Sequence, residues 1–229
     1  MATATLVRPK FDTILDVLNR VGHVPTERIL THPAPGTATE ADMFDNAITG
    51  GRICELVDGI LVEKAMGFRE DAINFWLGYL LQDFVVKDNL GMFGGPQGSI
   101  KLKLNLIRMP DISFIRWDSV EDARTIEEPE GACLEVVPNL VVEVLSPSNT
   151  TSEMTIKLGE YAQAGVSLVW YVDPKKQRVT VYPKGSERGK KVYGVEAVLD
   201  GGNVLPGLLL PVTKIFENRR PTTEAGKKV

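Results

Sequence analysis

Glu143 is the residue whose setting in this sequence most strongly suggests chemistry. It lies within the segment Leu140-Val-Val-Glu-Val-Leu145, whose apolar density is typical of a buried strand. An ionised carboxylate inside such a strand costs several kcal/mol unless a cation compensates its charge. Two interpretations are open: Glu143 is a ligand of a metal ion, or it belongs to a structural ion pair or a sheet edge.

Asp111 is a second carboxylate at the start of a predicted strand. It follows Pro110, and proline is confined to strand starts, edges and bulges. Alternation directs Asp111 to one face and Ile112 and Phe114 to the other. Aspartate is also common in plain turns, so a turn stays open for this residue alone. If the two strands are neighbours, Asp111 and Glu143 would supply the hard oxygen ligands that Mg²⁺ prefers, and such a metal could activate water against a phosphodiester.

Lys157 could complete this constellation from a helix. The sequence Thr150-Thr-Ser-Glu153 predicts a capping box that opens a helix, which must run back along the strand ending near Leu145. Lys157 would lie about 9 Å along this helix, and Glu143 about 7 Å below the strand end. The two residues are therefore level if the helix packs over that face. The alternative is an exposed lysine paired with an acid of its own helix.

Other acidic residues are weaker candidates. Glu55 lies on a predicted strand and could be a third acid of the site or an edge residue. Glu70, at the start of a long predicted helix, is a weaker candidate of the same kind. Glu63 and Lys64 close a predicted hairpin and are interpreted as surface charges.

Several common kinds of site have little support. The only histidines, His23 and His32, lie near the N-terminus, which makes a histidine-based zinc site or a Ser-His-Asp triad hard to assemble. The glycine-rich residues 91–98 lack the GxxxxGK[ST] pattern and are interpreted as a turn-rich connection. Cys54 and Cys133 lack metal-type spacing, and two free thiols indicate a reducing cytoplasm.

The elements that must position these residues follow from apolar periodicity and turn residues. Their order predicts an α/β (α+β) domain around a mixed β-sheet with flanking helices. The predicted division is an N-terminal helix and linker over 1–39, a main domain over 40–216 and a polar tail over 217–229. Helices are predicted at 11–21, 40–48, 69–86 and 150–165, and strands at 52–57, 60–64, 99–104, 110–115, 140–145, 168–172 and 178–182, with others near 191 and 208.

The composition restricts the function further. With 43% hydrophobic and 24% charged residues, the chain is typical of a globular protein. No apolar run reaches the about 20 residues that cross a membrane, and the N-terminal residues contain no apolar signal stretch. The net charge of -4 gives no long-range attraction to nucleic acid, so binding to DNA would require a local basic surface.

Five segments in register resemble the Uma-type family of endonucleases, within the PD-(D/E)xK restriction-endonuclease-like superfamily. The resemblance covers roughly residues 40–216. The segments are Glu55-Leu-Val-Asp-Gly59, Pro110-Asp-Ile-Ser-Phe114, Val142-Glu-Val-Leu-Ser-Pro-Ser148, Lys157 with Tyr161, and Trp170-Tyr-Val-Asp-Pro174.

The resemblance implies a restriction-endonuclease-like core and a site for Mg²⁺ or Mn²⁺ held by Asp111 and Glu143, with Glu55 as an accessory acid. The superfamily places a lysine two positions after the acid on the same strand, but here that position is Leu145. The family supplies this lysine from the following helix, which here is Lys157. Family members also often carry a histidine near the start of the long helix, where this sequence has Phe68-Arg69-Glu70.

Two hypotheses of function follow. The first is a Mg²⁺-dependent endonuclease acting on DNA, for which a C2 homodimer is the default assembly. The second is a catalytically degenerate nuclease-fold protein that acts as a binding or regulatory module. The acidic balance and the missing strand lysine favour the second.

Overall fold

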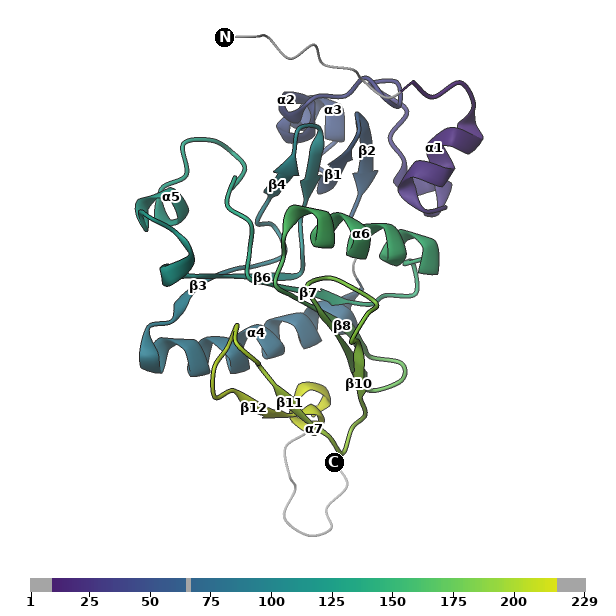
Figure 1. Ribbon diagram of the computed structural model, residues 1–229. Helices are drawn as coiled ribbons and strands as arrows, with labels where there is room; N and C mark the ends of the chain where they lie inside the picture. Colours follow the sequence, from purple (N-terminus) through teal and green to yellow (C-terminus); the bar gives the residue numbers. More distant parts are fainter. Residues whose placement is uncertain (1–9, 65–66, 218–229) are drawn as a thin grey trace, which may run out of the picture.

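The computed structural model describes residues 10–64 and 67–217. The predicted polar tail lies outside the described residues from 218 onward. At the centre is a six-stranded sheet of order β10-β9-β8-β7-β6-β3 (Figure 1). Strands β7 and β8 are parallel and all other pairs are antiparallel, so the predicted mixed sheet is confirmed. Its strands are β3 (Gly91–Gly94), β6 (Ile112–Arg116), β7 (Leu140–Val144), β8 (Leu168–Asp173), β9 (Arg178–Pro183) and β10 (Lys191–Tyr193).

Strand β3 corrects the interpretation of residues 91–98 as a turn-rich connection. It pairs with β6 at the edge of the sheet, with Gly91 opposite Arg116. A Cβ at Gly91 would collide with the carbonyl oxygen of Ile115 and the ring of Phe114. Glycine here permits a close approach of two strands, whereas the sequence alone indicated only a break in structure.

A second, antiparallel sheet of order β2-β1-β5-β4 lies beside the central one. Its first two strands form the predicted hairpin, whose turn residues Asp58 and Gly59 both have positive φ, at 49° and 81°. Strand β5 was not predicted, and its register with β1 proves important for the site. The strands are β1 (Cys54–Val57), β2 (Ile60–Glu63), β4 (Ile100–Lys103) and β5 (Leu106–Arg108).

Two long helices cover opposite faces of the central sheet. Helix α4 (Phe68–Asp88) packs Ile73 and Leu77 against Val142 and Trp170. Helix α6 (Thr151–Ala164) covers the other face with residues such as Leu158 and Tyr161 and lies between the two sheets (Figure 1). Half of the predicted capping box is present, because Thr150 accepts a hydrogen bond from the Glu153 amide, whereas the Glu153 carboxylate accepts from Arg28 and Asn149 instead of the Thr150 amide. Gly165 ends the helix in the left-handed conformation.

The N-terminal residues pack on the smaller sheet. Val17, Val21 and Val24 form a buried cluster with hairpin residues that include Val57 and Ile60. The predicted helix 40–48 is divided in two at Asp45, whose side chain caps the second part. The elements are α1 (Ile14–Val21), the 3-10 turn Thr26–Arg28, α2 (Glu40–Phe44) and α3 (Asn46–Thr49).

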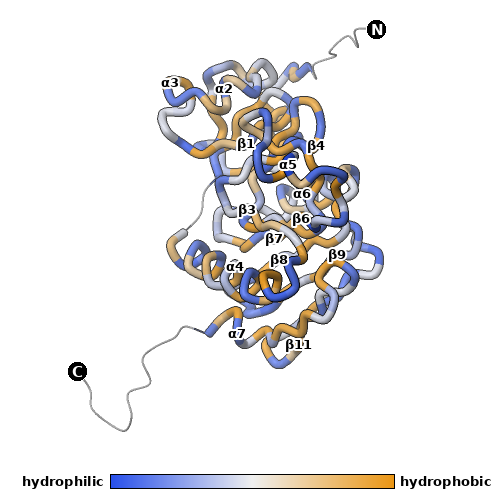
Figure 2. The backbone as a smooth tube through the Cα atoms, turned by 90° about the vertical axis from the view of Figure 1, so that its left-hand side faces the viewer, coloured by the Kyte–Doolittle hydropathy of each residue, from blue (hydrophilic) through white to orange (hydrophobic). Residues whose placement is uncertain are grey.

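The remaining elements complete the opposite end of the molecule. Leu199, Leu205 and Val212 join the core beneath α4, and Figure 2 shows β11 and α7 on that side, far from α2 and α3. These elements are β11 (Val198–Asp200), β12 (Leu209–Pro211) and α7 (Val212–Phe216). A 3-10 turn (Trp117–Ser119) and the short helix α5 (Arg124–Glu127) follow β6.

Candidate active site

Strands β6 and β7 bring Asp111 and Glu143 to the same face of the central sheet. Ile112 is paired with Val142, so one step further along the antiparallel register sets Asp111 beside Glu143. Val142 faces α4, and alternation therefore turns Glu143 toward α6. Asp111 Oδ2 accepts a hydrogen bond from the Val144 amide at 2.7 Å, which fixes its carboxylate across the two strands. Both acids are buried.

Helix α6 adds Lys157 and Tyr161 to these acids. Lys157 Nζ lies 3.4 Å from Glu143 Oε1 and 3.1 Å from Glu55 Oε1. The Tyr161 hydroxyl donates to Glu143 Oε1 at 2.6 Å. The contact with Glu143 shows that Lys157 lies at the level of Glu143 on the sheet, as predicted. Lys157 is only 3% exposed, so it is not a surface lysine paired with an acid of its own helix.

The smaller sheet contributes Glu55 and an arginine, Arg108, that sequence reasoning missed. Glu55 Oε2 accepts from Arg108 Nη1 at 2.7 Å, and Glu55 Oε1 also accepts from the Met109 amide at 3.1 Å. Val57 is paired with Leu106, so Glu55 and Arg108, each two residues away, share one face. Alternation within β5 was the available signal, but it required knowing that β1 and β5 are neighbours.

Lys64 is the second missed residue, and its interpretation as a surface charge was wrong. Its ammonium lies 2.7 Å from Asp111 Oδ1, and its side chain is 10% exposed. It also donates to the carbonyl oxygens of Met109 at 2.6 Å and Pro96 at 3.2 Å. The hairpin register contained a signal, because Glu55 pairs with Val62 and Lys64 lies two positions further on the same face.

A chain of ion pairs extends from this cluster to the N-terminal residues. Arg108 donates to Glu160 Oε2 from Nε at 2.8 Å and from Nη2 at 2.6 Å. Glu160 Oε1 also pairs with Arg20 of α1 at 2.9 Å. Arg28 and Glu153 form a second buried pair with two hydrogen bonds, of 2.9 and 3.2 Å. No local sequence pattern indicates these contacts, since their partners are far apart in the chain.

Charge is nearly balanced within the central cluster. The three carboxylates Asp111, Glu143 and Glu55 face three cations, Lys64, Lys157 and Arg108. Burial would raise the pKa of Glu55, but Lys157 and Arg108 outweigh burial and hold this pKa below its ordinary value. Glu55 is therefore ionised at neutral pH.

Glu143 differs from Glu55. Burial raises its pKa, the ammonium of Lys157 acts against burial, and the carboxylates of Asp111 and Glu55 add to the rise. Burial disfavours the charged form of Lys157, but Glu143 and Glu55 hold the pKa of Lys157 above its ordinary value. Within the cluster the pKa of Glu143 is thus shifted upward and that of Glu55 downward, and Lys157 keeps its proton.

Asp111 and Glu143 are the two carboxylates of the cluster that lie on adjacent strands and could hold a metal ion. Among residues 10–64 and 67–217, no group of three or more His, Cys, Asp or Glu side chains is arranged to hold a metal ion. Mg²⁺, however, keeps several water ligands and is commonly bound by one or two carboxylates. Asp111 Oδ1 is buried and accepts no hydrogen bond from a described residue, although it faces Lys64. Asp111 and Glu143 therefore fit a hydrated Mg²⁺ or Mn²⁺, and the Asp111 oxygen available to it is Oδ1, which in this structure is paired with Lys64.

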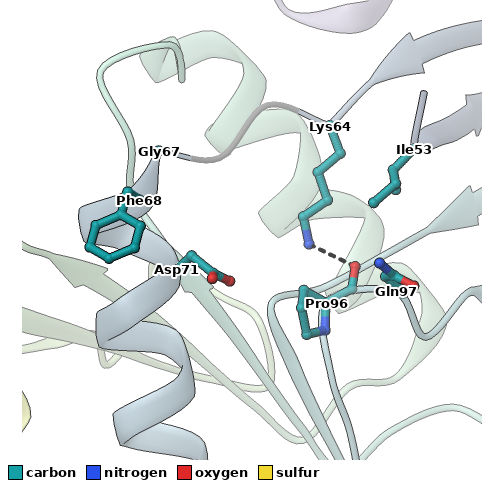
Figure 3. Close-up of a pocket in the computed structure, with 7 residues that line it drawn as sticks. All are labelled: Ile53, Lys64, Gly67, Phe68, Asp71, Pro96 and Gln97. Carbon is teal, nitrogen blue, oxygen red and sulfur yellow. Dashed lines mark hydrogen bonds between the residues drawn. The ribbon is translucent and has the colours of Figure 1, made fainter. Parts of the chain in front are cut away.

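A pocket of about 260 Å³ opens beside this cluster (Figure 3). Lys64 forms one wall of the pocket and at the same time pairs with Asp111. Asp71 and the exposed ring of Phe68 come from the first turn of α4, and Gln97 lies on the opposite side. Lys64 therefore borders both the pocket and the charged cluster.

Arg69 and Glu70 lie at the start of α4, where family members often carry a histidine, and their surroundings differ. Glu70 is buried in the first turn of α4. Arg69 is exposed and donates to the carbonyl oxygen of Pro174, after β8, at 3.0 Å. Cys54 and Cys133 are free and buried, and no helix of the described residues is long and apolar enough to span a membrane.

A mixed sheet with helices on both faces is the architecture of the restriction-endonuclease-like fold. The sequence profile of the Uma2 family, described as "Putative restriction endonuclease", matches residues 42–213, and the chain belongs to this family. The expected family and fold class are thereby confirmed.

The comparison with solved structures agrees on the fold. A crystal structure of "a putative nuclease belonging to DUF820" from Anabaena variabilis is 20% identical in sequence, with a TM-score of 0.60. The similarity covers 71% of this chain and 89% of that chain. No curated protein matches the sequence.

Proposed function

We propose that this protein is a divalent-metal-dependent endonuclease that hydrolyses phosphodiester bonds of DNA. One observation carries the proposal: Asp111, Glu143, Glu55 and Lys157 come from separate elements, yet they form one buried cluster. Two adjacent carboxylates on one sheet face each raise the cost of ionising the other, and a divalent cation between them would offset that cost. Nucleases of metal-dependent type do need such a pair.

The proposed roles follow from the contacts of each residue. Asp111 and Glu143 would hold Mg²⁺ or Mn²⁺, which when bound would polarise the phosphodiester and lower the pKa of an attacking water. Lys157 supplies a permanent positive charge toward the negative charge that develops on the phosphate. Glu55 orients Lys157 through the 3.1 Å contact, and Tyr161 orients Glu143.

The acidic chain would meet DNA through a local basic surface. Exposed Arg69, Lys175 and Lys176 lie at or near the turn after β8, where Arg69 binds Pro174, and Lys64 lines the pocket. Binding through these few cations should weaken steeply with salt. The two buried free thiols agree with a reducing cytoplasm, which we propose as the location.

Cleavage of supercoiled plasmid in Mg²⁺ or Mn²⁺ tests the proposal. The wild-type protein is expected to nick the plasmid, and both Asp111→Asn and Glu143→Gln should lose at least about 100-fold in rate, as expected when a metal ligand is lost. Asp122→Asn removes an exposed acid and serves as the control, with unchanged cleavage. Thermal unfolding of each variant verifies the fold. Intact plasmid with wild-type protein across a range of salt would exclude the proposed activity.

Enzymes that cut both strands of a duplex often use a dimer, so we propose a C2 homodimer as the active assembly. Light scattering coupled to size-exclusion chromatography, with and without DNA, measures this directly. A monomer in both conditions would refute the dimer.

The second candidate function is a binding or regulatory module that has lost catalysis. The observation that favours it is the charge balance of the cluster, in which three cations already compensate three carboxylates. Calorimetric titration with Mn²⁺ separates the two candidates. The nuclease requires a Mn²⁺ site that Glu143→Gln weakens, and the module requires none.

A further inference from the structure

Lys64 places its ammonium against Asp111, one of the two carboxylates of the proposed metal site. Its ammonium has three oxygen atoms within 3.2 Å, namely Asp111 Oδ1, the Met109 carbonyl and the Pro96 carbonyl. Strand β2 ends at Glu63, so Lys64 is the first residue beyond it and projects back over the site. A protein-bound cation thus stands at the carboxylate that would hold the metal.

The contact between Lys64 and Asp111 is close but poorly directed. Asp111 Oδ2 is engaged by the Val144 amide, whereas Oδ1 accepts no hydrogen bond from a described residue despite the 2.7 Å distance to Nζ. An ion pair without hydrogen-bond alignment supplies charge compensation but little geometric restraint. The well-directed bonds of Lys64 are those to the two carbonyl oxygens.

A divalent ion and the ammonium would compete for Asp111 Oδ1. Mg²⁺ binds oxygen at about 2.0–2.1 Å, so a bound ion would lie within a few ångströms of Nζ, where two positive charges repel strongly. The pocket beside Lys64 offers the side chain a place to go, because Lys64 forms its wall and Asp71 lies across it (Figure 3). A lysine has a flexible four-carbon stem, which makes this movement possible without a change of the backbone.

We infer that Lys64 is a displaceable counter-ion, which neutralises Asp111 when no metal is bound and competes with a divalent metal ion for Asp111 Oδ1. The inference rests on the proposed metal site and adds a residue that lowers its affinity. Displaced from Asp111, the ammonium enters the pocket, where a substrate phosphate would be its natural partner. The site is therefore kept stable without metal, and metal binding exposes a new cation toward the substrate.

Titration of the purified protein with Mn²⁺, followed by calorimetry and by the electron paramagnetic resonance of free Mn²⁺, tests the inference. Lys64→Met removes the charge and keeps the length of the side chain, and it should bind Mn²⁺ at least about tenfold more tightly than the wild-type protein. Lys64→Arg keeps the charge and should bind no more tightly than wild type. Lys101→Met is the matched control, because Lys101 pairs with Glu40 and Glu135 outside the cluster, and its affinity should not change.

Several results would overturn the inference. If Lys64→Met binds Mn²⁺ no more tightly than the wild-type protein, Lys64 does not compete with the metal. If Lys64→Arg gains as much Mn²⁺ affinity as Lys64→Met, the charge of the side chain is not the cause of the gain, and the inference also fails. If Lys64→Met fails to fold, Lys64→Gln and Lys64→Arg are compared instead, with the gain expected only for the neutral variant. Plasmid cleavage by the wild-type protein keeps the two proposals apart: cleavage with no gain in Lys64→Met refutes the competition alone, whereas no cleavage and no Mn²⁺ binding refutes both.

Discussion

Replacement of Arg108 by methionine tests whether the buried ion network holds the two halves of the molecule together. Arg108 is 3% exposed and donates three hydrogen bonds, one to Glu55 and two to Glu160. Methionine fills similar space but leaves two buried carboxylates each short of a partner. Removing one member of a buried ion pair typically costs about 3–5 kcal/mol, and we expect the free energy of unfolding to fall by that amount.

The size of this loss depends on what remains for each acid. Glu55 keeps Lys157 at 3.1 Å, and Glu160 keeps Arg20 at 2.9 Å. The larger penalty should therefore fall on Glu160, whose remaining partner is on the partly exposed α1 surface. The double variant Arg108→Met with Glu160→Gln should recover about 1–2 kcal/mol relative to the sum of the single variants, since the residues are in direct contact.

Urea unfolding followed by tryptophan fluorescence measures these differences, because Trp170 lies fully buried in the central sheet. The titrations are made in chelator so that metal binding does not add to stability. The slope of the free energy of unfolding against urea concentration should stay unchanged, because the variants expose the same surface on unfolding. Arg124→Met removes an exposed pair and should leave the free energy of unfolding essentially unchanged. A loss below about 1 kcal/mol in Arg108→Met, or strict additivity of the double variant, would refute the reasoning.

Three further predictions concern other parts of the molecule. Burial raises the pKa of Glu55, but Lys157 and Arg108 outweigh burial and hold this pKa below the ordinary 4.5. The ionised Glu55 therefore stabilises the fold above pH 4.5, and this contribution is lost as the pH falls. In the Glu55→Gln variant, the urea concentration at the midpoint of unfolding should fall less steeply with decreasing pH than in the wild-type protein. Gly22→Ala should cost at least about 1–3 kcal/mol by thermal unfolding, because φ is 73° and a Cβ would collide with the backbone of α6; Gly50→Ala, with open space, is the control. Both cysteine thiols should react with a disulfide reagent at least about 100-fold more slowly than in urea, since burial raises their pKa from 9.0 to about 11.

The parts of the site that the sequence predicted are those governed by local periodicity. Glu143 stands out because its own neighbours define a buried strand, and Asp111 because alternation starts at that residue. The level of Lys157 follows from the rise of a helix and of a strand, together with the assumption that the helix packs back on its strand. Each of these deductions needs only one or two adjacent elements.

Lys64 and Arg108 could not be found in that way, because their burial depends on how the two sheets meet. In sequence, Lys64 follows a hairpin strand and resembles a surface charge, and Arg108 ends a short apolar run, Leu106-Ile107, that was not predicted to be a strand. Both become buried because β1, β2 and β5 turn one face toward α6. The burial of Lys64 and Arg108 can be predicted only when their acidic partners on other elements are known.

Helix α6 explains why the cations of the smaller sheet belong to the site. Its acids Glu153 and Glu160 point toward Arg28 and Arg108, and its Lys157 points toward Glu143. If the two arginines were absent, Glu160 would keep only Arg20, and Glu153 would lose its ion-pair partner. The charge of Glu153, which already acts on Lys157, would then draw this lysine away from the central sheet. The smaller sheet and the N-terminal residues thus hold Lys157 in place by satisfying its neighbours, which is a requirement that no pattern confined to the central sheet could reveal.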